Sequence, residues 1–189
     1  MSIRQAILGF LSWKPFTGYE LKKIFADALS FHWSGNNNQI YGSLLDLHKS
    51  LCVSIEVLQQ EKLPAKKVYT ITEAGRGELR EWLLTEPELP ILRSPAHIQL
   101  AWAESLTGTE LDGLLAAYER QLGDQALMCR EAIRRERGAR ETKDGASSVP
   151  GRSPREKLIW ESIDENRAVF YETELAWAQE LRAKLKEMP

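Results

Sequence analysis

Cysteine and histidine are scarce in this 189-residue sequence, and their scarcity argues against several kinds of chemistry. Its two cysteines, Cys52 and Cys129, stand apart without CxxC spacing, so we expect buried thiols and no disulfide. The three histidines, His32, His48 and His97, are scattered and form no HxxxH pair. A sensing metal site built from His32, His48 and Cys52 is conceivable, but ligand sets normally show such spacing, and we predict no metal.

Long apolar runs and catalytic motifs are also missing. No segment approaches the roughly 20 apolar residues that span a bilayer. The first residues, "MSIRQAILGFLSWKPF", lack the apolar core and small-residue cleavage site of a secretory signal. GxSxG, P-loop and GxGxxG patterns are absent as well. We therefore predict a cytoplasmic protein that is not an enzyme, needs no cofactor and has no membrane partner.

Charge is nearly balanced over the whole chain but divides unevenly. The formal net charge is −2, and 43% hydrophobic residues are ordinary for a soluble globular protein. Residues 1–82 hold 10 lysines and arginines against 8 aspartates and glutamates, whereas residues 83–189 hold 15 against 19. The mildly basic first part suits an anionic partner better than the acidic remainder does.

Prolines indicate where the chain divides. Pro87, Pro90 and Pro95 interrupt any helix across residues 85–95. We predict a first domain at residues 1–85, a Pro-rich linker at 86–95 and a second domain at 96–189. The Gly-, Ser- and Pro-rich segment 142–154 predicts an exposed loop inside the second domain.

The first domain shows helical spacing and then strand spacing. Apolar residues recur every three or four positions in residues 3–11, in the segment that Thr17 can cap, and after the three asparagines of "SGNNNQIYGSLLDLHKS". The last of these stripes is Ile40, Leu44, Leu47 and Leu51. Three amphipathic helices of this length should pack on one another.

After these helices the apolar period changes to two. The segments "CVSIEVLQ" and "KVYTIT" alternate and predict the two strands of a hairpin. Thr72 then caps a helix that carries Leu79, Trp82 and Leu83 on one side. Three helices followed by a hairpin is the order of a winged helix-turn-helix, so the predicted fold is mostly α with a small β-hairpin wing.

The second domain has two long apolar stripes. The first runs through Leu111, Leu115, Tyr118, Leu122, Ala126, Cys129 and Ile133, and the second through Ile159, Ile163, Phe170, Trp177, Leu181, Leu185 and Met188. Two long helices and one loop predict an antiparallel helix hairpin. The surplus of apolar surface predicts a homodimer, in which this hairpin is the dimerisation domain. In the alternative, the stripes pack only on each other and on the helix at 95–106.

Three blocks of the first domain resemble PadR-type transcriptional regulators. They are "AILGFLSWKPFTGYELKKIF", "FHWSGNNNQIYGSLLDLHKS" and "PAKKVYTITEAGRGELREWL", in the family's order and within roughly residues 5–83. The acidic helical tail is similar to the subgroup with an extended C-terminal dimerisation domain, which includes AphA-like virulence activators and phenolic-acid-responsive repressors. Two positions depart from the family's pattern. Gly42 stands where a Pro is common, and Ser50 stands where a Gly usually ends the helix, so Ser50 must bear strain or end the helix differently.

The resemblance implies a homodimeric, sequence-specific DNA-binding regulator, with repression released by a small aromatic effector as the favoured mode. A helix-turn-helix places its second helix in the major groove, where Asn amides can bind adenine and Lys side chains can bind phosphate. The expected DNA-binding residues are Asn36, Asn37, Asn38, Tyr41, Lys49, Lys66, Lys67 and Tyr69. Capping of the helix is the alternative role for any one of the asparagines. A dimer predicts a near-palindromic double-stranded operator with half-sites about one helical turn, or a multiple, apart.

An effector pocket is the remaining expectation. Relatives that sense aromatic molecules suggest a lining of His97, Trp102, Tyr118, Trp160 and Trp177. Aromatic residues at helical spacing more often belong to a core. A second alternative for the whole protein is a winged-helix protein-interaction module without specific DNA binding, because the first domain is only weakly basic.

Overall fold

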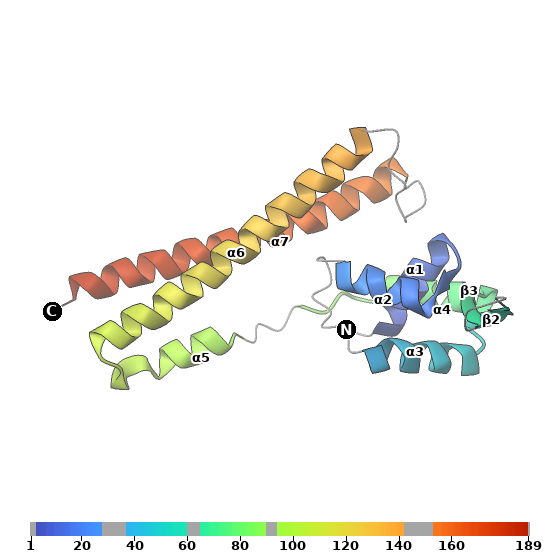
Figure 1. Cartoon of the computed structure of the whole chain (residues 1–189), viewed down its shortest axis with the longest axis horizontal. Coiled ribbons are helices and arrows are strands. Elements are labelled where there is room, and N and C mark those ends of the chain that lie inside the picture. Colours follow the sequence, from blue (N-terminus) through green and yellow to red (C-terminus); the bar gives the residue numbers. More distant parts are fainter. Residues whose placement is uncertain (1–2, 28–36, 60–64, 90–93, 142–152, 189) are drawn as a thin grey trace. The chain divides into compact units, whose positions relative to one another are not determined.

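The protein folds into two compact units, and the chain passes from the first to the second between Glu88 and Leu89. The computed structural model describes residues 3–27, 37–59, 65–89, 94–141 and 153–188 (Figure 1). Within these residues the structure is mostly helical and has one three-stranded antiparallel sheet. This confirms the predicted fold class.

The first unit has the element order of a winged helix. Its elements are α1 (Ile3–Trp13), β1 (Phe16–Thr17), α2 (Gly18–Asp27), α3 (Asn37–Lys49), β2 (Val53–Leu58), β3 (Lys66–Ile71) and α4 (Glu73–Leu83). The strands lie in the order β1-β3-β2, with Ile55 opposite Tyr69 and Val53 opposite Ile71. The short strand β1, where Phe16 pairs with Tyr69, has no signal in the sequence pattern.

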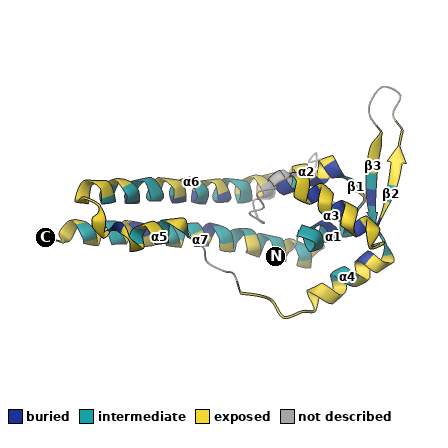
Figure 2. Cartoon of the chain, turned by 90° about the horizontal axis from the view of Figure 1, so that it is seen from below, coloured by how far each residue is buried: buried dark blue, intermediate teal, exposed yellow. Residues whose placement is uncertain are grey.

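The core of this unit joins the three helices to the sheet, as Figure 2 shows in dark blue. The predicted stripes supply it, and its largest fully buried side chains are Ile7, Leu8, Leu11, Phe16, Leu21, Phe25, Ile40, Leu44, Leu47 and Val53. Phe10 and Phe25 meet edge to face with ring centroids 5.2 Å apart. Because Ile40, Leu44 and Leu47 are all buried, one face of α3 is committed to the core.

The turn that ends α3 differs from the expectation. Leu51 has a φ of 61° and is the one non-glycine residue with positive φ in the described part of the chain. The Leu51 N–H donates to the His48 carbonyl at 3.0 Å and the Cys52 N–H to the Leu47 carbonyl at 2.9 Å, the two bonds of a Schellman motif. Leu51 is therefore not part of the helical stripe; it is 72% exposed. It takes the left-handed position instead of Ser50, at a cost of about 1–2 kcal/mol.

Helix α4 starts directly against this turn. The Thr72 hydroxyl accepts from the Gly75 N–H at 3.1 Å and donates to the Leu51 carbonyl at 2.7 Å, which confirms Thr72 as the cap. A Cβ on Gly75 would lie 2.2 Å from the Cys52 carbonyl oxygen, so only glycine fits there. Leu79 packs on the core, but Trp82 and Leu83 are 46% and 65% exposed. The predicted one-sided packing of α4 therefore holds only for its first half.

The second unit is a long antiparallel helix pair with a short helix beside it. Its elements are α5 (Pro95–Ala101), the 3-10 turn η2 (Ala103–Ser105), α6 (Gly108–Glu141) and α7 (Pro154–Glu187). The Ser94 and Ser153 hydroxyls cap α5 and α7, each of which has Pro in its first turn. None of the helices in the described residues combines the length and apolar character that a bilayer crossing requires.

Two arginine clamps fix the register of α6 against α7. The Arg182 guanidinium bonds both carboxylate oxygens of Asp112, at 2.7 and 2.8 Å, and Glu119 at 3.0 Å. These bonds hold the pKa of Asp112 well below its usual range. The second clamp consists of Arg130 with Glu165 and Glu172. In both clamps the two carboxylates are seven residues apart, about two helical turns.

Much of the predicted apolar stripe of α7 is not buried within the hairpin. Helix α6 buries its predicted residues Leu115, Leu122, Ala126 and Cys129, whereas the fully buried positions of α7 are Ala168 and Ala178. The predicted stripe residues Ile159, Ile163, Phe170 and Trp177 are 48%, 45%, 48% and 40% exposed. The two predicted stripes therefore do not simply pack on each other within one hairpin.

Candidate nucleic-acid interface

The outward face of α3 is the centre of the candidate site. At about 100° per residue, Asn38, Gly42, Leu45 and Lys49 follow one line on the side opposite the buried residues. All four are exposed. A Cβ on Gly42 would meet no atom within 4 Å, so the middle of this line is open to close approach. Leu45, which is 51% exposed, adds an apolar side chain to this line, and the residue pattern did not predict it.

The structure describes the three expected asparagines to different extents. Asn37 is the first residue of α3, but only its backbone is described, and Asn36 lies outside the described residues. Asn38 is exposed in the first turn. That turn carries no acidic residue, so the positive end of the helix dipole is not neutralised there by a carboxylate. At the other end, Lys49 lies 3.7 Å from Asp46, and both side chains are about two-thirds exposed.

Tyr41 is held by the beginning of α2. Its ring lies over Gly18, where a Cβ would come 2.5 Å from the Tyr41 Cε1 atom. Gly18 itself follows a capping box, because the Thr17 hydroxyl accepts from the Glu20 N–H at 3.1 Å and the Glu20 carboxylate accepts from the Thr17 N–H at 2.7 Å. Tyr41 is 45% exposed, so one edge of the ring packs and the other is open.

The wing lies close to the same helix start. Lys66 and Lys67 open β3 and are both exposed. Hydrogen bonds from Thr17 lower the pKa of Glu20, and the positive charges of Lys14 and Lys66 lower it further. The start of β3 therefore lies near the start of α2, where Thr17 pairs with Val68.

Tyr69 does not share this exposure. It is 7% exposed and belongs to the core. Burial raises the pKa of its hydroxyl, and the neighbouring Tyr41 raises it further. Tyr69, which was expected to contact DNA, therefore offers a duplex little accessible surface, and its hydroxyl lies near that of Tyr41. Tyr19, in the first turn of α2, is 70% exposed; its position off the apolar stripe of α2 was the signal that could have identified it.

In the second unit, three of the five expected pocket residues come together. The Tyr118 hydroxyl donates to Glu174 Oε1 at 2.9 Å, and His97 Nε2 lies 2.6 Å from the same oxygen. The Trp177 ring meets the His97 ring edge to face, with centroids 5.0 Å apart. Burial and the hydrogen bond to Glu174 raise the pKa of Tyr118. Glu174, which joins the cluster, was not expected from the sequence.

The other two pocket residues lie elsewhere. Trp102 is 78% exposed beside η2, and Trp160 is near the start of α7, about 25 Å along the helix from Trp177. A cavity of about 330 Å³ lies between α5 and α6. It is lined by Ser94, Gln99, Leu100, Leu115, Tyr118 and Gln121, among others. Its lining combines aliphatic side chains with a hydroxyl and two amides, and Tyr118 belongs both to it and to the Glu174 cluster.

The described part of the chain contains no group of side chains arranged to bind a metal ion. No three of its His, Cys, Asp and Glu side chains lie together as a metal site would require. Cys52 and Cys129 are both buried thiols without a disulfide. The histidine that was considered with them, His32, lies outside the described residues.

Comparison with known proteins finds similarity to one family in the first unit. Residues 7–81 match the family model described as the transcriptional regulator PadR-like family. The negative transcriptional regulator PadR of Bacillus subtilis is 32% identical over 88 residues, which are 47% of this chain and 48% of that protein. The probable transcriptional regulator Rv1176c of Mycobacterium tuberculosis is 34% identical over 90 residues, which are 48% of this chain and 47% of that protein. The matched segment thus spans about half the length of these curated relatives, and both are regulators of transcription.

Solved structures resemble the fold over nearly the whole chain. Bacillus subtilis PadR in complex with operator DNA has a TM-score of 0.82 at 20% identity and covers 97% of this chain and 98% of that chain. The same protein in complex with p-coumaric acid has a TM-score of 0.64 at 24% identity, covering 98% and 96%. The Vibrio cholerae virulence activator AphA has a TM-score of 0.61 at 24% identity and covers both chains completely. At these identities the likeness shows a shared fold.

The contact between Gly18 and Tyr41 generates a prediction. Gly18→Ala places a methyl group where the Tyr41 ring lies, so the ring must swing away while the fold survives. We expect Gly18→Ala to weaken binding to the duplex that the wild type enriches from a random-sequence library by about tenfold, or about 1.4 kcal/mol. Fluorescence anisotropy measures the affinity, and Gly77→Ala, which meets no atom within 4 Å, is the matched control.

The same experiment includes Tyr41→Ala and the double variant. If Gly18 acts through Tyr41, adding Gly18→Ala to Tyr41→Ala costs no further affinity. Fully additive losses would show that Gly18 does not act through this ring.

Proposed function

We propose that residues 7–81, which match the PadR-like family model, form a PadR-family winged-helix domain, and that the protein is a homodimeric repressor that binds operator DNA through the outward face of α3. The observation that carries the proposal is the composition of that face. It presents an amide at its first turn, an open glycine and an exposed leucine in the middle, and a lysine near its end.

The dimensions of α3 suit the major groove. The helix has 13 residues and is therefore about 20 Å long, and the groove is about 12 Å wide. The Asn38 amide is suited to the N6 and N7 positions of adenine, and Leu45 to a thymine methyl group. Asn36 and Asn37 extend the proposal to residues whose side chains the structure does not describe. Asp46 neutralises part of the charge of Lys49, so base contacts should centre on the part of α3 from Asn38 to Leu45.

The wing and the start of α2 supply the contacts that do not depend on sequence. Lys66 and Lys67 are exposed at the beginning of β3, close enough to α2 for Lys66 to lower the pKa of Glu20. Tyr19 adds an exposed hydroxyl beside them. Contacts of this kind hold phosphates, fix the register of the protein on the duplex and make the affinity depend on salt.

The exposed stripe of α7 supports a homodimer. Ile163, Phe170 and Trp177 recur every seven residues, and Ile159 lies one turn before them. A seven-residue repeat of apolar side chains is the seam of a coiled coil. Side chains of this size, 40–48% exposed along one flank, would be covered by the same flank of a second copy.

Repression and its release are the finer part of the proposal. Bacillus subtilis PadR, which shares 32% identity with this chain over 88 residues, is a negative transcriptional regulator, and its structure has been solved in complex with p-coumaric acid. In this chain we place the effector, a small aromatic acid, in the cavity between α5 and α6. There the Tyr118 hydroxyl, the Ser94 hydroxyl and two amides can bind its polar groups, and the leucines can pack on its ring.

The wing is tested by salt dependence. The double substitution Lys66→Ala with Lys67→Ala should weaken binding to every duplex about equally and reduce the slope of log affinity against log salt by about 1–2. Anisotropy titrations between low and high salt measure the slope, with Lys22→Ala and Lys23→Ala on α2 as the charge-matched comparison. An unchanged slope would remove the wing from the phosphates. A wild type with no affinity for any duplex would favour a protein-interaction module instead.

The dimer is tested by a charge placed on the stripe. Phe170→Glu should convert the chain to a monomer at micromolar concentration, because a carboxylate cannot be buried in an apolar seam without a partner. Light scattering after size-exclusion chromatography measures the mass. The control is Ala176→Glu, an exposed position on a different side of the same helix. A Phe170→Glu variant that keeps the mass of the wild-type dimer would place the interface elsewhere.

The effector site is tested by ligand titration. We expect p-coumaric acid or a related hydroxycinnamic or hydroxybenzoic acid to bind the wild type and to lower its affinity for DNA. Tyr118→Phe, which removes one hydroxyl from the cavity, should weaken that binding about tenfold. Isothermal titration calorimetry measures it, with Trp160→Phe as the control outside the cavity. Equal binding by Tyr118→Phe would move the site away from α5.

A further inference from the structure

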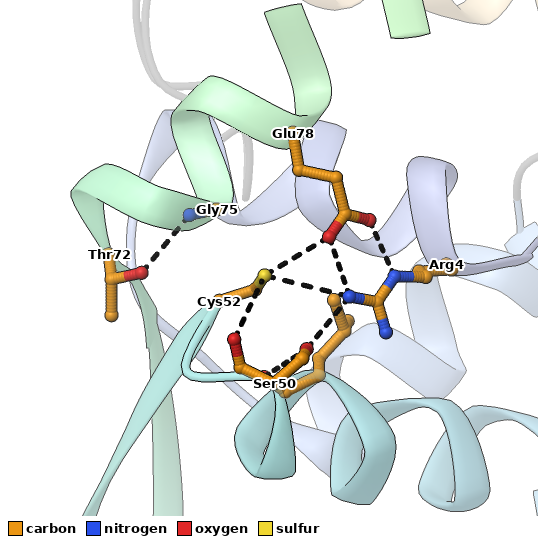
Figure 3. Close-up of polar contacts among 7 residues, drawn as sticks. Arg4, Ser50, Cys52, Thr72, Gly75 and Glu78 are labelled. Carbon is orange, nitrogen blue, oxygen red and sulfur yellow. Dashed lines mark hydrogen bonds and ion pairs between the residues drawn. The ribbon is translucent and has the colours of Figure 1, made fainter. Parts of the chain in front are cut away.

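In the first unit, the guanidinium of Arg4 on α1 is hydrogen-bonded both to α4 and to the turn that follows α3 (Figure 3). Arg4, on α1, donates from Nε to Glu78 Oε1 at 2.5 Å and from Nη2 to Glu78 Oε2 at 2.6 Å, a two-bond pair that reaches α4. The same Nη2 donates to the Ser50 hydroxyl at 2.8 Å, at the turn that ends α3. We call Arg4, Ser50, Cys52 and Glu78 the three-way joint.

Cys52 closes the joint from the sheet side. Its thiol donates to Glu78 Oε2 at 3.1 Å and lies 3.5 Å from Arg4 Nη2, and the residue is 5% exposed. The hydrogen bonds from Arg4, and then from Cys52, lower the pKa of Glu78. The pair therefore stays charged down to a pH below the usual value of 4.5 for a glutamate. Its two side chains are 26% and 30% exposed, so water screens it less than a surface ion pair.

The ion pair of the three-way joint holds α4 to α1. Among the residues that the structure describes, Glu78 is the α4 side chain that forms an ion pair. Beyond it, residues 81–89 are all exposed, as the yellow end of α4 in Figure 2 shows. The chain then continues to the second unit after Glu88. Among the described residues, Glu78 therefore makes the α4 ion pair nearest to the point where the chain leaves the first unit.

The other end of the joint is the turn that orients α3. Ser50, Leu51 and Cys52 form the left-handed turn, and their N–H groups bond the carbonyls of the last turn of α3. Thr72 and Gly75, at the start of α4, contact the same turn through the Leu51 and Cys52 carbonyls. Moving α4 without moving the end of α3 would break the Arg4 bonds to Glu78 or to Ser50.

From this geometry we propose that Arg4 is a positioning residue for DNA recognition. It joins the end of α3 to α4, so that these two helices keep one relative orientation. The proposal rests on the proposed function for its DNA readout. Arg4 touches no DNA in this account, and its effect is on the angle of α3.

The test compares Arg4→Gln, Glu78→Gln and the double variant with the wild type in the full-length chain. The first measurement is the affinity for the duplex that the wild type enriches from a random library, divided by the affinity for a scrambled duplex. We expect this ratio to fall about tenfold in each single variant and no further in the double variant, because both remove the same lock. Glu81→Gln, an exposed carboxylate on the same helix, is the matched control and should keep the wild-type ratio.

The second measurement is amide hydrogen exchange at Ser50, Leu51 and Cys52 in the absence of DNA. Exchange should be about tenfold faster in Arg4→Gln than in the wild type or in Glu81→Gln, because the turn loses its tie to Glu78 in the middle of α4 and keeps only the bonds from Thr72 at the start of that helix. If Arg4→Gln fails to fold, Arg4→Lys takes its place, since lysine keeps the charge but not the planar two-bond geometry. A smaller change of the same sign is expected for it.

The outcomes separate the two proposals. A lower melting temperature with an unchanged affinity ratio and unchanged exchange at the turn would make Arg4 a structural ion pair and overturn the inference. A wild type that prefers no duplex would end the proposed function. In that case the hydrogen-exchange measurement alone tests whether Arg4 holds the turn after α3, because it needs no DNA.

Discussion

The burial of Ile40, Leu44 and Leu47 in the core of the first unit determines what the rest of the protein can do with α3. Each of these side chains is fully buried, so the rotation of the helix about its own axis is set by the largest free-energy term available to it. With that rotation fixed, Asn38, Gly42, Leu45 and Lys49 have to face outward. A partner that binds this face of α3 therefore contacts an amide at Asn38, open backbone at Gly42, methyl groups at Leu45 and a cation at Lys49.

The elements around α3 then fix its ends. At its first turns, Tyr41 packs over Gly18 and brings the start of α2 against the helix. At its last turn, the left-handed Leu51 and the Arg4 guanidinium hold the chain where α4 begins. A recognition helix has to be positioned to within a fraction of an ångström for paired hydrogen bonds to bases. The contacts at both ends supply that positioning.

Much of this arrangement follows from local pattern, and the remainder depends on contacts between distant residues. The apolar periods of three to four and of two predicted the helices and the hairpin, and Thr17 and Thr72 were identified as caps from residue type alone. The pattern could not identify Leu51, because left-handed geometry is normally signalled by glycine and here is imposed on a leucine by the Schellman bonds around it. Nor could it identify Arg4 with Glu78 or His97 with Glu174, since 74 and 77 residues separate the partners. Tyr69 has the residue type of a surface contact, and only the register of β3 against β1 and β2 shows that it is buried.

The helical unit shows how a correct pattern leaves orientation undetermined. Periodicity predicted apolar stripes on both long helices, and both stripes exist. Helix α6 turns its stripe to its neighbour, whereas α7 packs through Ala168 and Ala178 and leaves Phe170 and Trp177 exposed. Small residues let the two backbones approach closely, and the arginine clamps hold that register. The larger apolar side chains are the ones that the proposed dimer would cover, and that proposal links the helical hairpin to a two-fold symmetric DNA target.

The most direct test of that account is selection of bound duplexes by the full-length chain from fragments of its source genome. Two copies of α3, related by a two-fold axis, should enrich fragments that carry one short motif twice, in inverted orientation. The motif centres should be about 10–10.5 base pairs, or a multiple of that, apart. Recovered fragments that share no motif, or that carry a single copy with no inverted partner, would contradict it.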